Sequence, residues 1–210
     1  MLKEACVENF TNVPGVIERG AKRIELCDNL AVGGTTPSIG VIKITAEYCS
    51  DKDASIIVIL RPRGGDFVYS LMEKAIMMRD LEEILVLQAN GLAVGALPAA
   101  NALDKPFLEE IAKLASDNGI ELAFHMAFDE IPEEKQRDAL LWLGEIGFKR
   151  ILTHGGPKEN TIFDNAAHIA ELAKITPDMT IMPGGGIMKD NLADLEKVLE
   201  LTEVHGTRIV

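Results

Sequence analysis

Two arginines separated by a single proline are the most distinctive chemical feature of this 210-residue sequence. Arg61 and Arg63 flank Pro62, and a Gly-Gly-Asp run that ends at Asp66 follows them. Each guanidinium is a planar fork of N–H donors that matches a carboxylate or a phosphate. We therefore predict that Arg61, Arg63 and Asp66 belong to a binding site for a small anionic ligand, phosphorylated or carboxylated.

Glycine-rich turns recur after other segments that are expected to be strands. They are Gly-Gly-Thr-Thr-Pro-Ser at 33–38, His-Gly-Gly at 154–156 and Pro-Gly-Gly-Gly at 183–186. Glycine lets a backbone approach a ligand closely, and N–H groups at such turns bind anions. Four residues of these turns join the predicted ligand-binding set: Gly155, Gly156, Gly184 and Gly185.

A second group of polar residues suits acid–base catalysis. Glu25, His125 and Asp129 stand at or just beyond the ends of expected strands. A histidine beside carboxylates can act as a general base, because its unperturbed pKa is about 6.5. The same carboxylates, together with Glu4, can hold a hard divalent metal ion. These residues are the candidate catalytic set.

The elements that must position these residues alternate along the chain. Eight short apolar or alternating segments predict strands, at residues 2–7, 23–27, 55–60, 92–97, 120–125, 150–153, 180–183 and 203–205. Seven longer segments between them predict helices, at residues 12–20, 38–49, 70–89, 104–118, 132–146, 160–175 and 190–201.

Strands that alternate with helices indicate a parallel sheet, because parallel strands need crossover connections. Eight such units in this length predict closure into a (β/α)₈ TIM barrel, with an open doubly wound sheet as the alternative. No linker divides the sequence, so we expect residues 1–210 to form a single TIM-barrel domain. Because the eighth expected strand ends close to Val210, the last helix is expected to be short or absent.

A missing last helix would leave one side of the barrel thinly covered. The outward residues Ala5, Val7 and Val204 would then be exposed between the flanking helices. Exposed apolar surface of this kind tends to be covered by a partner. We therefore predict a homodimer or a higher homo-oligomer.

Alternation within the strands predicts an unusually polar interior. In the segment 23–27, Ile24 and Leu26 share one face, while Glu25 and Cys27 share the other. The apolar face must meet the helices, so the opposite face points into the barrel. Seven residues are predicted to point inward: Glu4, Cys6, Glu25, Cys27, Arg61, His125 and His205. Buried carboxylates need charged partners, and we expect Glu25 to hold Arg61.

Composition limits the partners. The 21 Lys and Arg against 33 Asp and Glu give a net charge of −12, which lacks the basic footprint of nucleic-acid binding. No apolar run reaches the roughly 18 residues of a membrane span. The three cysteines include no Cys-x-x-Cys pair and are expected to be reduced thiols of a cytoplasmic protein.

Six motifs together resemble the CutC family of copper homeostasis proteins. They are Arg-Pro-Arg-Gly-Gly-Asp-Phe at 61–67, Arg-Ile-Glu-Leu-Cys at 23–27, the turns at 33–38 and 183–187, Phe-His-Met-Ala-Phe-Asp at 124–129, and Glu-Val-His-Gly at 203–206. The resemblance covers the whole chain and implies a cytoplasmic TIM barrel with a role in copper homeostasis. Met126 and His154 depart from the residues that are frequent at these places in the family.

The resemblance makes copper the expected metal. As Cu(I), copper favours thiolate and thioether ligands. Cys6 and Cys27 end strands that are expected to be neighbours, about 5 Å apart. We predict Cys6, Cys27 and His205 as the metal ligands. The alternative is a TIM-barrel enzyme that acts on a small anionic metabolite, with or without a divalent metal.

Overall fold

Eight parallel strands alternate with seven helices in the part of the chain that the computed structural model describes, residues 1–99 and 102–210. The strands are β1 Leu2–Glu8, β2 Arg23–Cys27, β3 Ser55–Ile59, β4 Gly91–Val94, β5 Glu121–Phe124, β6 Arg150–Thr153, β7 Thr180–Pro183 and β8 Glu203–Gly206. The helices are α1 Val13–Glu18, α2 Ile39–Asp51, α3 Leu71–Leu85, α4 Lys105–Asp117, α5 Glu133–Glu145, α6 Ala166–Ile175 and α7 Lys189–Leu195. Two short 3-10 helices, η1 Leu30–Val32 and η2 Met126–Glu130, follow β2 and β5.

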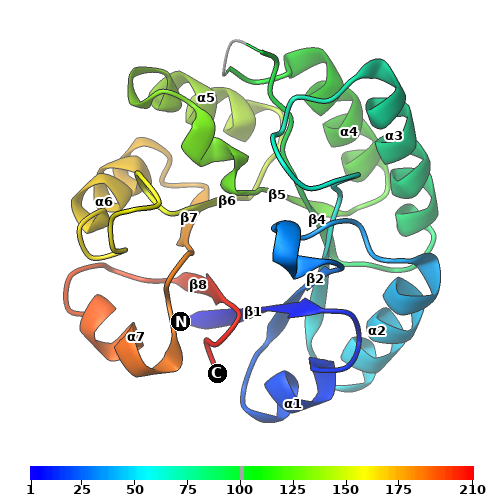
Figure 1. Cartoon of the computed structure of the whole chain (residues 1–210), viewed down its shortest axis with the longest axis horizontal. Helices are drawn as coiled ribbons and strands as arrows, with labels where there is room; N and C mark the ends of the chain where they lie inside the picture. The colour runs from blue at the N-terminus through cyan, green and yellow to red at the C-terminus, as the bar shows by residue number, and fades with distance from the viewer. Residues whose placement is uncertain (100–101) are drawn as a thin grey trace.

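The strands form a ring with the helices outside it (Figure 1). The hydrogen-bonded order runs β7-β6-β5-β4-β3-β2-β1-β8, and β7 and β8 lie side by side where the ring meets. The predicted TIM barrel is therefore confirmed. Within the described residues, no helix is long and apolar enough to cross a membrane.

The two faces of β2 have the predicted assignment. Ile24 and Leu26 are fully buried and belong to the large apolar core between the strands and the helices. Inside the barrel, Ile57, Ala93 and Ala123 form a small apolar layer on the β3–β5 side. Glu4, Glu25 and His205 lie on the opposite side of the lumen, on β1, β2 and β8.

Some element boundaries differ from the prediction for local reasons. Strand β4 begins at Gly91 and ends at Val94, because the chain then turns and the Leu97 amide bonds to the Phe67 carbonyl. Helix α6 begins six residues later than predicted. The Asp164 carboxylate accepts hydrogen bonds from the amide and the hydroxyl of Thr161, which holds residues 161–164 in a turn.

Residues 207–210, which follow β8, form no helix in the described chain, but the expected exposure of the outer strand faces is wrong. Ala5, Val7 and Val204 are all buried within this chain. The segment after β8 folds back, so that Arg208 bridges to Met188 at the start of α7 and Ile209 enters the core. This short segment covers the outer faces of β1 and β8 in place of a helix. The exposed apolar surface on which the homo-oligomer prediction depended is therefore not found.

The covering segment yields a stability prediction. Ile209 is fully buried and Ile44 is half exposed, so Ile209→Ala should lower the free energy of unfolding by about 2–4 kcal/mol. Ile44→Ala is the matched control and should change it by less than about 0.5 kcal/mol. Urea unfolding of both variants measures the difference. Equal effects would show that residues 207–210 do not cover the barrel.

Candidate functional site

A cavity of about 160 Å³ opens at the carboxyl ends of the strands and contains most of the predicted inward residues. We call it the thiol cavity. Its walls are formed by twelve residues: Cys6, Glu25, Cys27, Leu30, Gly33, Ile59, Arg61, Phe67, His125, Met126, Leu152 and His205. Residues from β1, β2, β3, β6 and β8, and from the segments that follow β3 and β5, thus meet in one space, as the strand alternation predicts.

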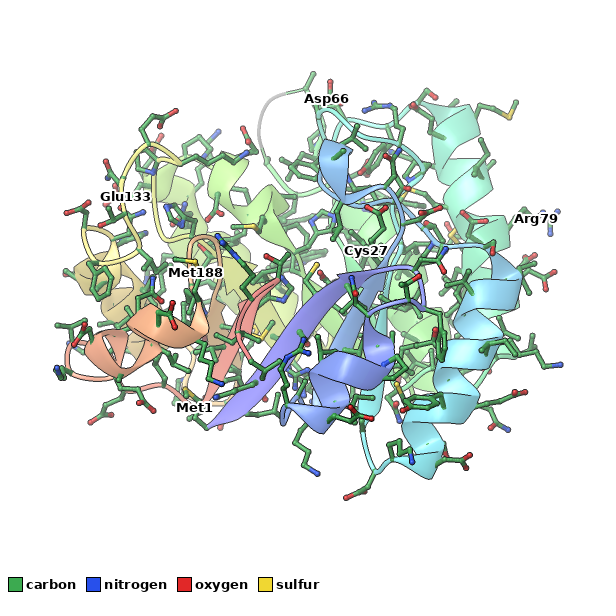
Figure 2. All side chains as sticks on the ribbon, turned by 60° about the horizontal axis from the view of Figure 1, so that its bottom comes forward. Met1, Cys27, Asp66, Arg79, Glu133 and Met188 are labelled. Atoms are coloured by element: carbon green, nitrogen blue, oxygen red, sulfur yellow. The ribbon has the colours of Figure 1, made fainter. Side chains whose placement is uncertain are left out.

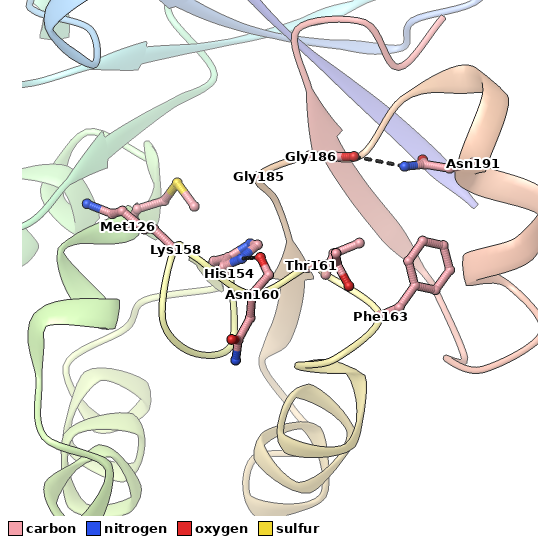
Figure 3. A pocket seen from close by; sticks show the side chains of 10 residues that line it. Met126, His154, Lys158, Asn160, Thr161, Phe163, Gly185, Gly186 and Asn191 are labelled. Carbon is pink, nitrogen blue, oxygen red and sulfur yellow. Dashed lines mark hydrogen bonds between the residues drawn. The ribbon is translucent and has the colours of Figure 1, made fainter.

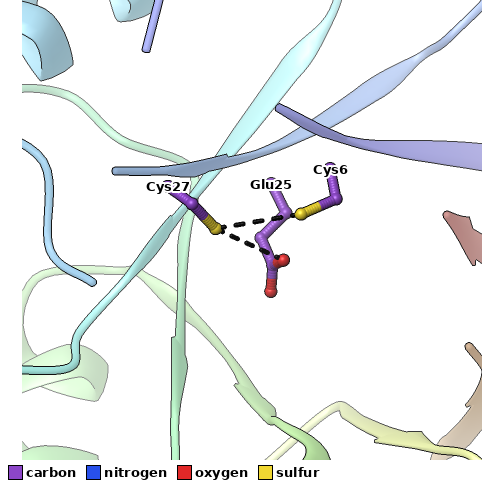
Figure 4. A group of neighbouring side chains, drawn as sticks. All are labelled: Cys6, Glu25 and Cys27. Carbon is purple, nitrogen blue, oxygen red and sulfur yellow. Dashed lines mark hydrogen bonds between the residues drawn. The ribbon is translucent and has the colours of Figure 1, made fainter. Parts of the chain in front are cut away.

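Two thiols face each other on one wall of this cavity (Figure 4). The sulfurs of Cys6 and Cys27 lie 3.9 Å apart, and the Cys27 thiol lies 3.6 Å from a carboxylate oxygen of Glu25. All three side chains are buried. One donor atom from each lies within 4.8 Å of the others, close enough for a single metal ion.

The surroundings of the two thiols differ. The hydrogen bond from Cys27 lowers the pKa of the Cys6 thiol, and His205 adds to this effect. The same shared hydrogen bond raises the pKa of Cys27, as do burial and the nearby Glu25 carboxyl. Cys6 is therefore the thiol that loses its proton first.

His205 lies between two buried carboxyl groups because of the strand register. Glu4 pairs with His205 across β1 and β8, and Cys6 pairs with Glu25 across β1 and β2. The His205 Nδ1 atom lies 2.8 Å from Glu4, and its Nε2 atom lies 3.6 Å from Glu25. Burial opposes a charge on the ring, but Glu25, Cys6 and Glu4 raise the pKa of His205 well above 6.5.

The two carboxyl groups respond differently to this histidine. Burial alone would raise the pKa of Glu4, but the hydrogen bond from His205 and the charges of His205 and Arg23 lower it to about 2. Burial raises the pKa of Glu25 well above its ordinary value, and the neighbouring Cys6 and Glu4 charges add to this. Glu4 is thus the carboxyl that ionises more readily, whereas Glu25 is the one that holds a proton more readily.

A chain of ion pairs continues below Glu4 toward the other end of the barrel. Arg23 contacts both Glu4 and Glu203, and Glu203 also accepts a hydrogen bond from Arg150 at 2.8 Å. Arg150 in turn reaches Glu121 at 2.7 Å. Arg23 shares a face of β2 with Glu25 and Cys27, but it is not among the predicted inward residues, so this network was missed. Arg23 stands directly opposite Glu4 in the β1–β2 register, which the alternation within one strand does not reveal.

Arg61 is a support for loops, and the predicted pair with Glu25 is wrong. Its guanidinium donates to the backbone carbonyls of Val32, Gly34 and Gly65, and it stacks 4.9 Å from the Phe67 ring centre. No ion pair joins Arg61 to Glu25 in the described chain. The carboxyl takes His205 as its partner instead, because β8 brings the imidazole closer.

Arg63 has all of its N–H groups in use. It donates to Glu73, to the Asp66 carboxylate at 3.0 Å, and to the carbonyls of Gly64, Asp66 and Val68. Asp66 also accepts a hydrogen bond from the Val68 amide. The two residues fix their own loop, so a ligand would have to displace these bonds to reach the Arg63 fork.

Of the three candidate catalytic residues, Glu25 and His125 border the thiol cavity and Asp129 does not. Burial and the Arg61 charge lower the pKa of His125 to about 3, and its Nδ1 accepts the Ala127 amide. Its ring is thus a neutral donor through Nε2, which has no partner among the described residues. Asp129 accepts hydrogen bonds from Thr153 and the His154 amide at the end of β6, away from Glu25.

The predicted glycines are divided between two further cavities. Gly185 borders a cavity of about 530 Å³ between the β6–α6 and β7–α7 connections. Gly155 and Gly156 border another, of about 470 Å³, beside α5. The amide of Gly184 bonds to the Thr153 carbonyl and its carbonyl faces His154, so this residue joins the two strand ends.

Together these features define a (β/α)₈ barrel with a buried thiol pair at the carboxyl ends of its strands and an ion network below it. The chain belongs to the CutC family, whose model matches residues 1–210. A family protein CutC of Enterococcus faecalis is 47% identical over 211 residues, with full coverage of both chains. The copper homeostasis protein cutC homolog of Dictyostelium discoideum is 33% identical and covers 96% of this chain and 80% of its own. The crystal structure of CutC from Streptococcus agalactiae superposes with a TM-score of 0.94 at 40% identity, over 100% of each chain.

The position of His205 yields a pH prediction. Its pKa is raised in the folded protein, so its contribution to stability is complete below the unfolded value of about 6.5 and is lost as pH rises through the folded pKa. His205→Gln should therefore be less stable than the wild type by about 3 kcal/mol near pH 6, with a gap that narrows at alkaline pH. Urea unfolding as a function of pH measures this gap. A gap that is constant or widens with pH would contradict the assignment.

The revised ion pairing yields a second prediction. In a double-mutant cycle, Arg23→Met and Glu4→Gln should couple by more than about 1.5 kcal/mol, because the two groups are in direct contact. Arg61→Met and Glu25→Gln should couple by less than about 0.5 kcal/mol, because each has other partners. Chemical unfolding of the four single variants, the two double variants and the wild type gives both values. The opposite ranking would restore the pairing expected from the sequence.

Proposed function

We propose that this protein serves copper homeostasis by binding one Cu(I) ion between Cys6 and Cys27. The observation that carries the proposal is the 3.9 Å separation of their sulfurs. Cu(I) prefers thiolate ligands, and two metal–sulfur bonds of about 2.3 Å reach sulfurs up to about 4.6 Å apart. The family and the name of the Dictyostelium discoideum relative support copper as the metal.

The strand register favours a metal over a disulfide at this pair. Cys6 lies opposite Glu25, and Cys27 is two residues further along β2. One strand spacing and two residue rises separate their Cα atoms by roughly 8 Å, beyond the limit of about 7 Å for a disulfide without backbone movement. The side chains lean together, but only a bridging ion spans the gap without distorting the barrel.

His205 acts in this proposal as a counter-charge and not as a copper ligand. Both of its ring nitrogens face carboxyl groups, Glu4 at 2.8 Å and Glu25 at 3.6 Å. Two thiolates around one Cu(I) carry a net negative charge, and a protonated imidazole beside Cys6 offsets it. Glu4 is already compensated by Arg23, so the Glu4, Glu25 and His205 group is a poorer metal site than the thiols.

Glu25 can take up a proton when copper binds. Metal binding requires thiolates and therefore releases protons. The Glu25 carboxyl lies 3.6 Å from the Cys27 sulfur, and its surroundings raise its pKa. A buried acceptor beside the thiol lets the proton leave without crossing the apolar wall of the cavity.

We also propose a cytoplasmic location for the protein, because two closely spaced free thiols suit a reducing compartment.

Copper titration of cysteine variants tests this proposal. Cys6→Ala and Cys27→Ala should each lower Cu(I) affinity by at least about 100-fold, because only one soft ligand is left. Cys49→Ala is the matched control, since Cys49 is also a buried free thiol but lies in the α2 core with a pKa of about 11, raised by burial. Anaerobic competition with a chromophoric Cu(I) chelator measures all three.

Wild-type protein should bind one Cu(I) ion, and Cys49→Ala should match it. Wild-type affinity in Cys27→Ala, or an equal loss in Cys49→Ala, would overturn the assignment of copper to this pair.

A further inference from the structure

A second and larger cavity lies beside the thiol cavity and is not used by the proposed copper site. We call this 530 Å³ space the side cavity. The loop from β6 to α6 forms one wall, and the Gly185–Gly186 turn after β7 forms the other (Figure 3). Met126 borders both cavities. A volume of this size at the carboxyl ends of barrel strands is typical of a small-molecule site.

Three consecutive backbone N–H groups stand free in the turn. The amides of Gly185, Gly186 and Ile187 donate to no acceptor in the described part of the chain. Gly185 and Gly186 have φ of +85° and +76°, a conformation that favours glycine. Successive N–H groups of a turn form a concave anion site.

The turn is held in place from both sides. Asn191 donates to the Gly186 carbonyl and accepts from the Met188 amide, each at 2.8 Å. The His154 ring lies 3.2 Å from the Gly184 carbonyl and 3.1 Å from the Asn160 carbonyl. The histidine thereby joins the two walls of the side cavity. A Cβ atom on Gly185 would lie 2.8 Å from the His154 ring, which leaves room only for glycine.

The rest of the lining combines one cation with apolar groups. Lys158 borders the cavity, and its ammonium group has only a 3.5 Å contact with Glu130 on the exposed surface. Met126, Ile162 and Phe163 supply an apolar surface, and the Phe163 ring is 39% exposed. An aromatic ring open to a cavity is a surface on which a flat ligand packs.

We propose that the side cavity binds a small organic phosphomonoester. The free amides of 185–187 offer three positively polarised donors, and Lys158 adds a flexible cation on the Met126 side of the cavity (Figure 3). A terminal phosphate has three acceptor oxygens and about two negative charges, so it uses this set more fully than a carboxylate does. The apolar body of the ester lies against Phe163 and Met126. This proposal does not depend on copper, and its test uses metal-free protein.

Three probes distinguish the contribution of the phosphate group to binding from that of the apolar part of the ligand. They are phenyl phosphate, inorganic phosphate and phenol. In calorimetric titration at constant ionic strength, phenyl phosphate should bind at least about tenfold more tightly than either of the other two, because it uses both parts of the site. In ¹⁵N NMR spectra, inorganic phosphate should shift the amide signals of Gly185, Gly186 and Ile187. This second measurement needs no variant.

Two variants with matched controls complete the test. Lys158→Met and Phe163→Ala should each weaken phenyl phosphate binding by about five- to tenfold. Lys174→Met, an exposed lysine on α6, and Leu141→Ala, a half-exposed apolar residue on α5, should not change it. The proposal is overturned if phenyl phosphate gains less than about threefold over inorganic phosphate, or if phosphate leaves the three amide signals unmoved.

Discussion

The pairing of Glu4 with both Arg23 and His205 is the interaction on which the interior of this barrel depends. A carboxylate in the middle of a barrel has no water to solvate it, and a single partner rarely compensates its desolvation. The parallel register places Arg23 on one side of Glu4 and His205 on the other, in the two neighbouring strands. Strands β2, β1 and β8 are therefore joined through charge as well as through their backbones.

This pairing sets the chemistry of the thiol cavity above it. Because Glu4 holds the Nδ1 side of His205, the Nε2 side is directed toward Glu25, and the ring remains charged in a buried place. The positive charge favours a thiolate at Cys6. The copper site that we propose is thus prepared by groups that do not bind the metal, which is the usual role of the shell around a metal centre.

The loops at the barrel opening have an independent support. The Arg61 guanidinium donates hydrogen bonds to three backbone carbonyls from two loops. The Arg63 guanidinium donates to groups of its own loop. In the structure these arginines support the wall of the thiol cavity, and their role as an anion receptor stays a prediction. In this wall the Arg61 Nε and His125 Nε2 atoms have no hydrogen-bond partner among the described residues, and free backbone N–H groups are found in the Gly185–Gly186 turn, at the other side of the opening.

The fold and the inward residues could be predicted because alternation within strands is a local property. The alternation in β2 is enough to assign its two faces, with Ile24 and Leu26 on one and Glu25 and Cys27 on the other. The pairing between side chains could not be predicted in the same way, because it depends on which residues stand opposite each other in neighbouring strands. Arg23 and Glu203 were missed for this reason. The cover over β8 was also missed, since nothing local in residues 207–210 indicates that they fold back.

The charge on His205 is the most direct test of this account. The ¹⁵N chemical shifts of its two ring nitrogens, followed by NMR from about pH 6 to pH 9, report whether one or both carry a proton. The account predicts imidazolium shifts for both nitrogens at neutral pH in metal-free protein, with titration only well above the ordinary histidine range. Shifts of a neutral tautomer at neutral pH would contradict it. Glu4 would then lack the positively charged His205 partner on which the barrel interior depends.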